Sequence, residues 1–245
     1  AEDMAAQIRA AVGPMLQARG AALSDVESLG AVVPGSIDAS GETVLDAHNL
    51  DFHNVPLRKL LQEQFPGIPV YIANDANGAA LAELYTGAFV GCKTGVLLTL
   101  GTGLGGGIIL NGKVLMGAHA AAGEVSGLVS DISKMTDDDF KLTSVERYSE
   151  APLWSGMASA SGLIFEYARQ KHLPTGSPMP TGEEIFAAYN AGEPEAQKAL
   201  KIFARRVAVG ILSLQHVLDV EKVAIGGGIS NQPLLLDSLR RVYAG

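Results

Sequence analysis

Two glycine-rich segments contain the residues best suited to bind phosphate. Residues 98–107 read LTLGTGLGGG, and residues 225–230 read IGGGIS. Glycine lets main-chain N–H groups approach an anion closely, and the hydroxyl of Thr102 adds a further donor. The second segment is expected between a strand and a helix, where a helix N-terminus can also face a ligand. Two such segments in one chain favour a nucleotide.

Both glycine segments also have a purely structural explanation. Gly101, Gly103 and Gly106 match the spacing of the dinucleotide fingerprint, but that motif leads into a helix, whereas this segment leads into another strand. A Rossmann site is therefore disfavoured. The remaining alternatives are an anion-binding β-hairpin and a hairpin whose glycines serve packing only. For residues 226–228, a tight strand-to-helix turn that needs glycine for packing is an equal alternative.

A second set of residues could transfer a proton and hold hydroxyl groups. Asn74 and Asp75 follow a short apolar segment and precede an alanine-rich helical segment. Such an Asp can act as a general base and the Asn amide can hold a substrate hydroxyl, although helix N-capping is the commoner role of an Asp there. Glu124 ends a loop of small residues and could bind a polyol, or be an ordinary solvated charge. His119 lies in the same loop and could contact a ligand.

The elements that would position these residues alternate between helices and strands. Before residue 90, apolar spacing predicts helices at 2–19 and 55–65 and buried strands at 29–33 and 70–73. Later elements are a strand at 96–100, the glycine segment 101–107, a strand at 108–110 turning at Asn111-Gly112, a strand at 222–225 and a helix at 234–242. A capping box from Thr181 to Glu184 is expected to lead into one long helix, with an apolar stripe from Ala199 to Val217.

Composition restricts the class of protein. The chain has 245 residues, a formal charge of −8 and 47% hydrophobic residues, which excludes a disordered chain and argues against nucleic-acid and membrane partners. A single cysteine, Cys92, excludes a disulfide framework and indicates a reducing compartment. Without a bilayer-spanning run or a signal pattern, we expect a cytoplasmic protein. Residues 131–152 are expected to form a charged surface excursion, with Asp137–Asp139 solvated rather than metal-bound.

Four ordered motifs resemble the ROK family of bacterial sugar kinases and sugar-responsive repressors. They are Ala73–Asn77, Leu98–Gly107, Gly117–Glu124 and Ile225–Ser230. The resemblance runs from about residue 30 to residue 241, including Val33–Asp38 and Asn49-Leu50. It implies an α/β fold of the actin/hexokinase-like (ribonuclease H-like) type, with two lobes and the active site in the cleft. We expect an N-terminal lobe at 1–88, on the sugar-binding side, and a C-terminal lobe at 89–245.

The resemblance also implies roles for individual residues. Asp75 would be the catalytic base that takes the proton from a sugar hydroxyl, commonly on C6, as it attacks the γ-phosphate of ATP, which binds with Mg²⁺. The sugar would be held by Asn49, Asn74, Glu124 and His119. Gly101, Thr102 and Gly103 would face the phosphates, and Gly226, Gly227 and Gly228 the adenosine.

The sequence departs from the family pattern in three ways. Val125-Ser126-Gly127 replaces the Gly-His that typically follows the Glu, and the cysteine-rich zinc loop is missing. We therefore expect no structural zinc, as in the branch with β-glucoside kinase-like members, so a hexoside is an alternative to a hexose. The Asp-x-Gly-x-Thr phosphate motif is also missing. We expect a chain truncated at both ends, with an incomplete N-terminal lobe and weak or no kinase activity alone.

Two other functions stay open beside that of a sugar kinase. The chain could be the sugar-sensing domain of a ROK-type transcriptional repressor, or a catalytically silent sugar-binding remnant. Family repressors usually carry a helix-turn-helix and the zinc cysteines, and neither is found in this sequence. The family is often dimeric, so a homodimer is a further expectation by analogy.

Overall fold

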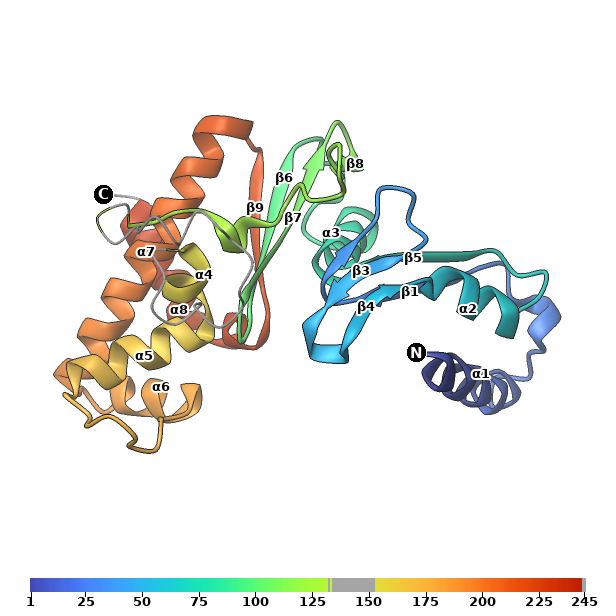
Figure 1. The fold of residues 1–245 in the computed structure, drawn as a ribbon. Coiled ribbons are helices and arrows are strands. Elements are labelled where there is room, and N and C mark those ends of the chain that lie inside the picture. The colour runs from blue at the N-terminus through green and yellow to red at the C-terminus, as the bar shows by residue number, and fades with distance from the viewer. Residues whose placement is uncertain (132, 134–152, 244–245) are drawn as a thin grey trace.

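The computed structural model describes residues 1–131, 133 and 153–243, and Figure 1 shows them as two α/β lobes. Most of the expected surface excursion at 131–152, including Asp137–Asp139, lies outside the described residues. None of the helices in the described part of the chain combines the length and apolar character needed to cross a bilayer.

The N-terminal lobe is built around two small sheets. Its elements are α1 (Glu2–Gln17), β1 (Leu29–Val33), β2 (Ser36–Ile37), β3 (Val44–Ala47), the 3-10 turn η2 (His48–Leu50), β4 (Phe52–Val55), α2 (Leu57–Gln64) and β5 (Val70–Asn74). β1 pairs parallel with β5, and β2, β3 and β4 form an antiparallel sheet. The strands predicted at 29–33 and 70–73 and the helices predicted at 2–19 and 55–65 are confirmed, with ends shifted by up to two residues.

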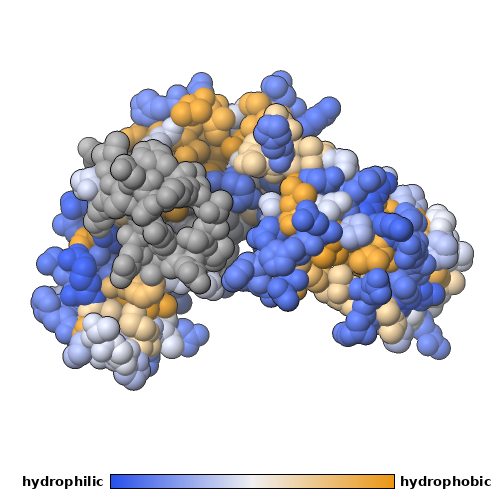
Figure 2. Space-filling view, viewed as in Figure 1, coloured by the Kyte–Doolittle hydropathy of each residue, from blue (hydrophilic) through white to orange (hydrophobic). Residues whose placement is uncertain are grey.

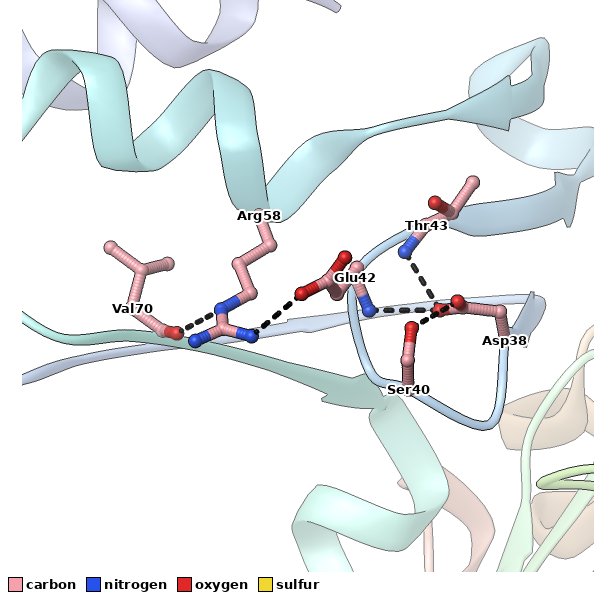
Figure 3. Close-up of polar contacts among 6 residues, drawn as sticks. All are labelled: Asp38, Ser40, Glu42, Thr43, Arg58 and Val70. Atoms are coloured by element: carbon pink, nitrogen blue, oxygen red, sulfur yellow. Dashed lines mark hydrogen bonds and ion pairs between the residues drawn. The ribbon is translucent and has the colours of Figure 1, made fainter.

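A network of polar contacts fixes the hairpin between β2 and β3 (Figure 3). The carboxylate of Asp38 accepts hydrogen bonds from the hydroxyl of Ser40 and from the main-chain N–H groups of Glu42 and Thr43, both at 2.8 Å. Arg58 donates to the Glu42 carboxylate at 3.2 Å and to the Val70 carbonyl oxygen at 2.9 Å. The hairpin is thereby tied to β5, and β3 leads directly into η2, which carries Asn49.

The C-terminal lobe is a four-stranded sheet with helices packed against it (Figure 1). Its sheet order is β8-β7-β6-β9, with β6 and β9 parallel. The elements after β5 are α3 (Asp75–Thr86), β6 (Gly95–Leu100), β7 (Leu104–Leu110), β8 (Lys113–Val114), η3 (Val125–Gly127), α4 (Trp154–Ala158), α5 (Ala160–Gln170), α6 (Gly182–Asn190), α7 (Pro194–Leu218), β9 (Lys222–Gly226), η7 (Gly228–Asn231) and α8 (Pro233–Tyr243). The predictions of a strand at 222–225 and a helix at 234–242 are confirmed. α3 packs against β7, and the lobe boundary between residues 88 and 89 stays a prediction.

The prediction that the glycine segment separates two strands is wrong for its second half. Gly105, Gly106 and Gly107 lie inside β7, and only residues 101–103 form the turn. A Cβ atom on Gly107 would lie 2.6 Å from the Cβ of Ala80 in α3, and one on Gly106 would lie 2.7 Å from the carbonyl oxygen of Gly123. These glycines therefore let α3 and the loop before Glu124 approach β7 closely, so the packing explanation holds for this half of the segment.

The single long helix expected after residue 181 is divided into α6 and α7. The predicted capping box is confirmed, since Thr181 Oγ1 accepts from the N–H of Glu184, and the Glu184 carboxylate accepts from the N–H of Thr181. The chain then turns at Gly192, whose φ is 84°, and Pro194 begins α7. Proline favours the first position of a helix because its missing N–H needs no partner there.

Candidate active site

A cleft of about 640 Å³ lies between the two lobes and is lined by residues of both. Figure 2 shows the molecule hollowed between the lobes on the viewed side. Eight of the residues expected to bind or react line this cleft: Asn49, Asn74, Asp75, Gly101, Thr102, Gly103, Glu124 and Gly227. Among the described residues, the lining includes neither His119 nor Gly226 nor Gly228.

Asn74 and Asp75 lie where β5 gives way to α3. Asn74 is the N-cap of α3, because its Oδ1 accepts from the main-chain N–H groups of Ala76 at 2.9 Å and Asn77 at 3.1 Å. Its Nδ2 donates to the carbonyl oxygen of Gly35 at 3.0 Å. The capping role weighed for Asp75 is thus filled by Asn74. The exposed carboxylate of Asp75 opens into the cleft, and among the described residues its one hydrogen bond is from the N–H of Ala76 to Oδ1.

Glu124 brings a second carboxylate to the same end of the cleft. It follows Gly123, whose φ of 94° lets the loop pass within contact of Gly106 in β7. The pKa of Glu124 is raised, mainly because the cleft walls partly desolvate its carboxyl group and also because the negative charge of Asp75 is nearby. Solvent still reaches the side chain, so this end of the cleft remains open to a ligand.

The turn between β6 and β7 is anchored on both sides and leaves donors free. Gly101 donates its N–H to the carbonyl oxygen of Gly103 at 3.0 Å, and the carbonyl oxygen of Gly101 accepts from Ala160 at the start of α5 at 2.8 Å. The N–H groups of Thr102 and Gly103 have no acceptor among the described residues, and the side chain of Thr102 is exposed. Main-chain N–H groups and a hydroxyl in such a turn can bind an anion.

The second glycine segment reaches the cleft through one residue. Gly227 follows β9 with φ of 88°, and a Cβ atom there would lie 2.4 Å from the carbonyl oxygen of Leu100 at the end of β6. β6 and β9 are parallel, so their ends meet and bring Gly227 beside the Gly101–Gly103 turn. Close packing therefore explains the glycine at 227, and the same packing makes it part of the cleft wall.

Several lining residues were not predicted. Ser126 lines the cleft in the segment that departs from the family pattern. Ser155 lines it from α4, Ser159 from between α4 and α5, and Ser161 and Phe165 from α5. Ser155 is nearly buried and accepts the N–H of Leu104 at 3.1 Å, while Ser159 caps α5. The sequence offers one indication that these residues could line a cleft, the run of small residues SGMASASG at 155–162. That run contains no side chain typical of catalysis, so it did not stand out.

The described residues include no group of three or more His, Cys, Asp or Glu side chains that could hold a metal ion. The cleft carboxylates of Asp75 and Glu124 are thus a pair without a third acidic or imidazole ligand among residues 1–131, 133 and 153–243.

Comparisons with known proteins agree with the resemblance found in the sequence. A family model described as "ROK family" matches residues 1–244. The glucokinase of Halalkalibacterium halodurans is 32% identical over 215 residues, which cover 84% of this chain and 63% of the glucokinase. The chain thus spans less than two thirds of that relative. The xylose repressor of Caldicellulosiruptor bescii is 32% identical over 218 residues, covering 87% of this chain and 53% of the repressor.

A solved structure shows the same fold. The ROK family glucokinase from Streptomyces griseus, determined in complex with glucose and AMPPNP, superposes with a TM-score of 0.77 at 29% identity, covering 99% of this chain and 77% of the glucokinase. The expected two-lobed, actin/hexokinase-like α/β fold is confirmed.

Proposed function

Since this chain belongs to the ROK family, we propose that its protein transfers the γ-phosphoryl group of ATP to a hydroxyl group of a hexose or a hexoside, with the C6 hydroxyl as the expected acceptor. The observation that most supports this function is the lining of one cleft by Asp75 from the β5–α3 junction and by the Gly101–Gly103 turn. The solved relative from Streptomyces griseus contains glucose and an ATP analogue, the two ligands that this reaction requires.

In this proposal Asp75 is the general base. A sugar hydroxyl becomes a better nucleophile when a carboxylate accepts its proton during attack on phosphorus. The carboxylate of Asp75 suits the role because it is exposed in the cleft and no described cation is paired with it. The N–H of Ala76, 2.8 Å from Oδ1, orients the carboxylate without neutralising it.

Asn49, Asn74 and Glu124 would hold the sugar. Asn74 has one amide N–H left after its bond to Gly35, and that N–H can donate to a sugar oxygen. Glu124 accepts hydrogen bonds from hydroxyl groups best when ionised, so its raised pKa makes sugar binding sensitive to acid. Asn49 approaches from η2, which follows the β2–β3 hairpin that Asp38 and Arg58 secure.

The phosphates would bind at the turn between β6 and β7. Phosphoryl transfer depends chiefly on positioning and electrostatic stabilisation. The Thr102 hydroxyl and the N–H groups of Thr102 and Gly103, which bind no described residue, can supply both. Gly227 beside them would admit the nucleotide close to the main chain. Mg²⁺, expected to bind with ATP, would supply positive charge that stabilises the phosphates. The described residues offer no ready cluster for it, so none of the roles proposed here passes through the metal.

Release of ADP, measured with ATP and a panel of hexoses and β-glucosides, tests the activity. We expect turnover with at least one sugar, and loss of at least about 100-fold in Asp75→Asn, because general-base catalysis contributes on the order of 10²–10⁴-fold. Calorimetry on the same variant should show sugar binding close to that of the wild type. Full turnover in Asp75→Asn would refute the assignment of the base.

The relationship to a xylose repressor supports a second candidate, a sugar-sensing domain. The two functions share sugar binding and differ in phosphoryl transfer. Sugar binding without AMPPNP binding in calorimetry, and without ADP release in the activity assay, would favour the sensing domain.

A further inference from the structure

A buried carbonyl oxygen without a donor lies two residues beyond Asp75 on α3. The side chain of Asn77 is part of a residue only 4% exposed, and its Oδ1 receives no hydrogen bond from any described residue. Buried polar atoms are nearly always paired, because an unpaired one has lost water without gaining a partner. Packing alone therefore does not account for an asparagine at this position.

Exchanging the amide nitrogen and oxygen would not satisfy the group. Nδ2 of Asn77 lies 3.9 Å from the sulfur of Met116, a thioether that accepts hydrogen bonds weakly and cannot donate them. An oxygen facing that sulfur would still lack a donor. The N–H of Asn77 donates to Oδ1 of Asn74, so the unpaired oxygen sits in a fixed first turn of the helix that carries Asp75.

Met116 begins the loop that ends at Glu124, and this loop has donors without acceptors. Its N–H groups at residues 117–121 bind no described residue, while Ala122 donates to the carbonyl oxygen of Met116 at 3.1 Å. The loop passes through left-handed backbone at Gly117, with φ of 73°, and at Ala120, with φ of 55°. An alanine held in that region is unfavourable, so a rearrangement of the loop would relieve strain.

We propose that Asn77 is a positioning residue for sugar binding. When a sugar occupies the cleft, the loop closes, one N–H from residues 117–121 donates to Oδ1 of Asn77, and Glu124 is held against the sugar hydroxyls. Oδ1 of Asn77 has no donor among the described residues while the loop is in its present position, so this bond would form only on closure and would stabilise the closed, sugar-bound arrangement. This inference rests on the proposed sugar binding.

Replacing Asn77 with leucine separates this role from a structural one. N77L keeps the approximate shape of the side chain and removes the unpaired oxygen, so the ligand-free variant should unfold at the wild-type temperature or above. Calorimetry with the hexose or β-glucoside that the wild type binds best should show affinity about tenfold lower, equivalent to about 1.4 kcal/mol. N190L makes the same change on the exposed end of α6 and should leave affinity unchanged.

Hydrogen exchange provides a readout that a purely structural role would not alter. Saturating sugar should slow exchange of the amides at 117–121 in the wild type and in N190L, and should not slow it in N77L. N77A, which cannot overfill the site, is measured in the same way if N77L does not fold.

Three results would overturn the inference. Wild-type affinity and loop protection in N77L would show that Asn77 does not position the loop. Lower stability with unchanged affinity would make Asn77 a structural residue only. A wild-type chain that binds no sugar in the panel would overturn the proposed function together with this role, whereas the first two results leave the proposed function intact.

Discussion

Substituting Gly107 with alanine should push α3 away from β7 and displace the proposed base. A Cβ atom at Gly107 would lie 2.6 Å from the Cβ of Ala80 and 2.8 Å from the carbonyl oxygen of Ala76. Carbon atoms pack at about 3.5–4.0 Å, so the first contact is short by about 1 Å. The oxygen of Ala76 belongs to the backbone of α3 and cannot rotate aside. The helix itself must move, and Asp75 is its first residue.

The expected cost follows from that overlap. Overpacking of this kind destabilises a protein by about 1–3 kcal/mol. For a chain of this size, each kcal/mol lowers the unfolding temperature by about 2–4 °C. A shift of Asp75 by about 1 Å should lower kcat/KM for phosphoryl transfer by up to about 100-fold.

Gly30→Ala is the matched control. Gly30 also lies within a strand, β1, but a Cβ atom there would meet nothing within 4 Å. Removing a glycine from an unstrained position should leave stability unchanged or raise it by about 0.4–1 kcal/mol. Thermal unfolding and steady-state kinetics on both variants measure the difference. If Gly107→Ala matched Gly30→Ala in both assays, the explanation of these glycines by helix approach would be wrong.

Three further predictions concern the cleft and its support. Because the pKa of Glu124 is raised, sugar affinity should fall as pH drops and this carboxylate becomes protonated. Asp75→Asn removes the nearby negative charge and should move this fall to lower pH. Calorimetry over about pH 4–7 would contradict both expectations by showing a flat profile. Glu166→Gln should destabilise the lobe by about 2 kcal/mol, because the nearly buried carboxylate of Glu166 binds Arg206 at 3.0 Å. Burial raises the pKa of Glu166, but its hydrogen bonds to arginine and glutamine and the nearby positive charge outweigh burial and leave the pKa lowered. The stability that Glu166 contributes should therefore be present above its ordinary pKa and be lost as pH falls below it. Urea midpoints measured against pH would refute this if the variant and the wild type lost stability in parallel. Gly227→Ala should weaken AMPPNP binding and lower thermal stability, because a Cβ atom there meets the Leu100 carbonyl oxygen at 2.4 Å; unchanged values in both assays would contradict it.

The sequence predicts elements well where local chemistry decides them. Pro34 and Gly35 end the apolar run of β1, and Thr181 and Glu184 begin α6 through bonds between near neighbours. Gly105–Gly107 were not predicted as part of a strand, because a glycine within a strand is needed where a segment distant in sequence packs closely against it. Nothing within residues 98–110 indicates that Ala80 would pack there.

The same distinction applies to the cleft. Asp75 and Thr102 could be singled out because their residue types and neighbours suggest chemistry. Ser161 and Phe165 could not, because they reach the cleft through the packing of α5, whose first residue donates its N–H to the Gly101 carbonyl oxygen. The role of Asn77 was also hidden, since its burial and missing donor are properties of the folded chain.

The parallel pairing of β6 with β9 can form only late in the synthesis of the chain. Gly95 lies opposite Lys222, so a long intervening segment must be made and closed before this pair can form. Pairing between such distant segments is slow, because loop-closure entropy is lost before the contacts compensate for it. The cleft wall beside the Gly101–Gly103 turn is therefore completed only after Gly227 has been synthesised. Asp75 is thus synthesised long before the residues that complete the cleft around it.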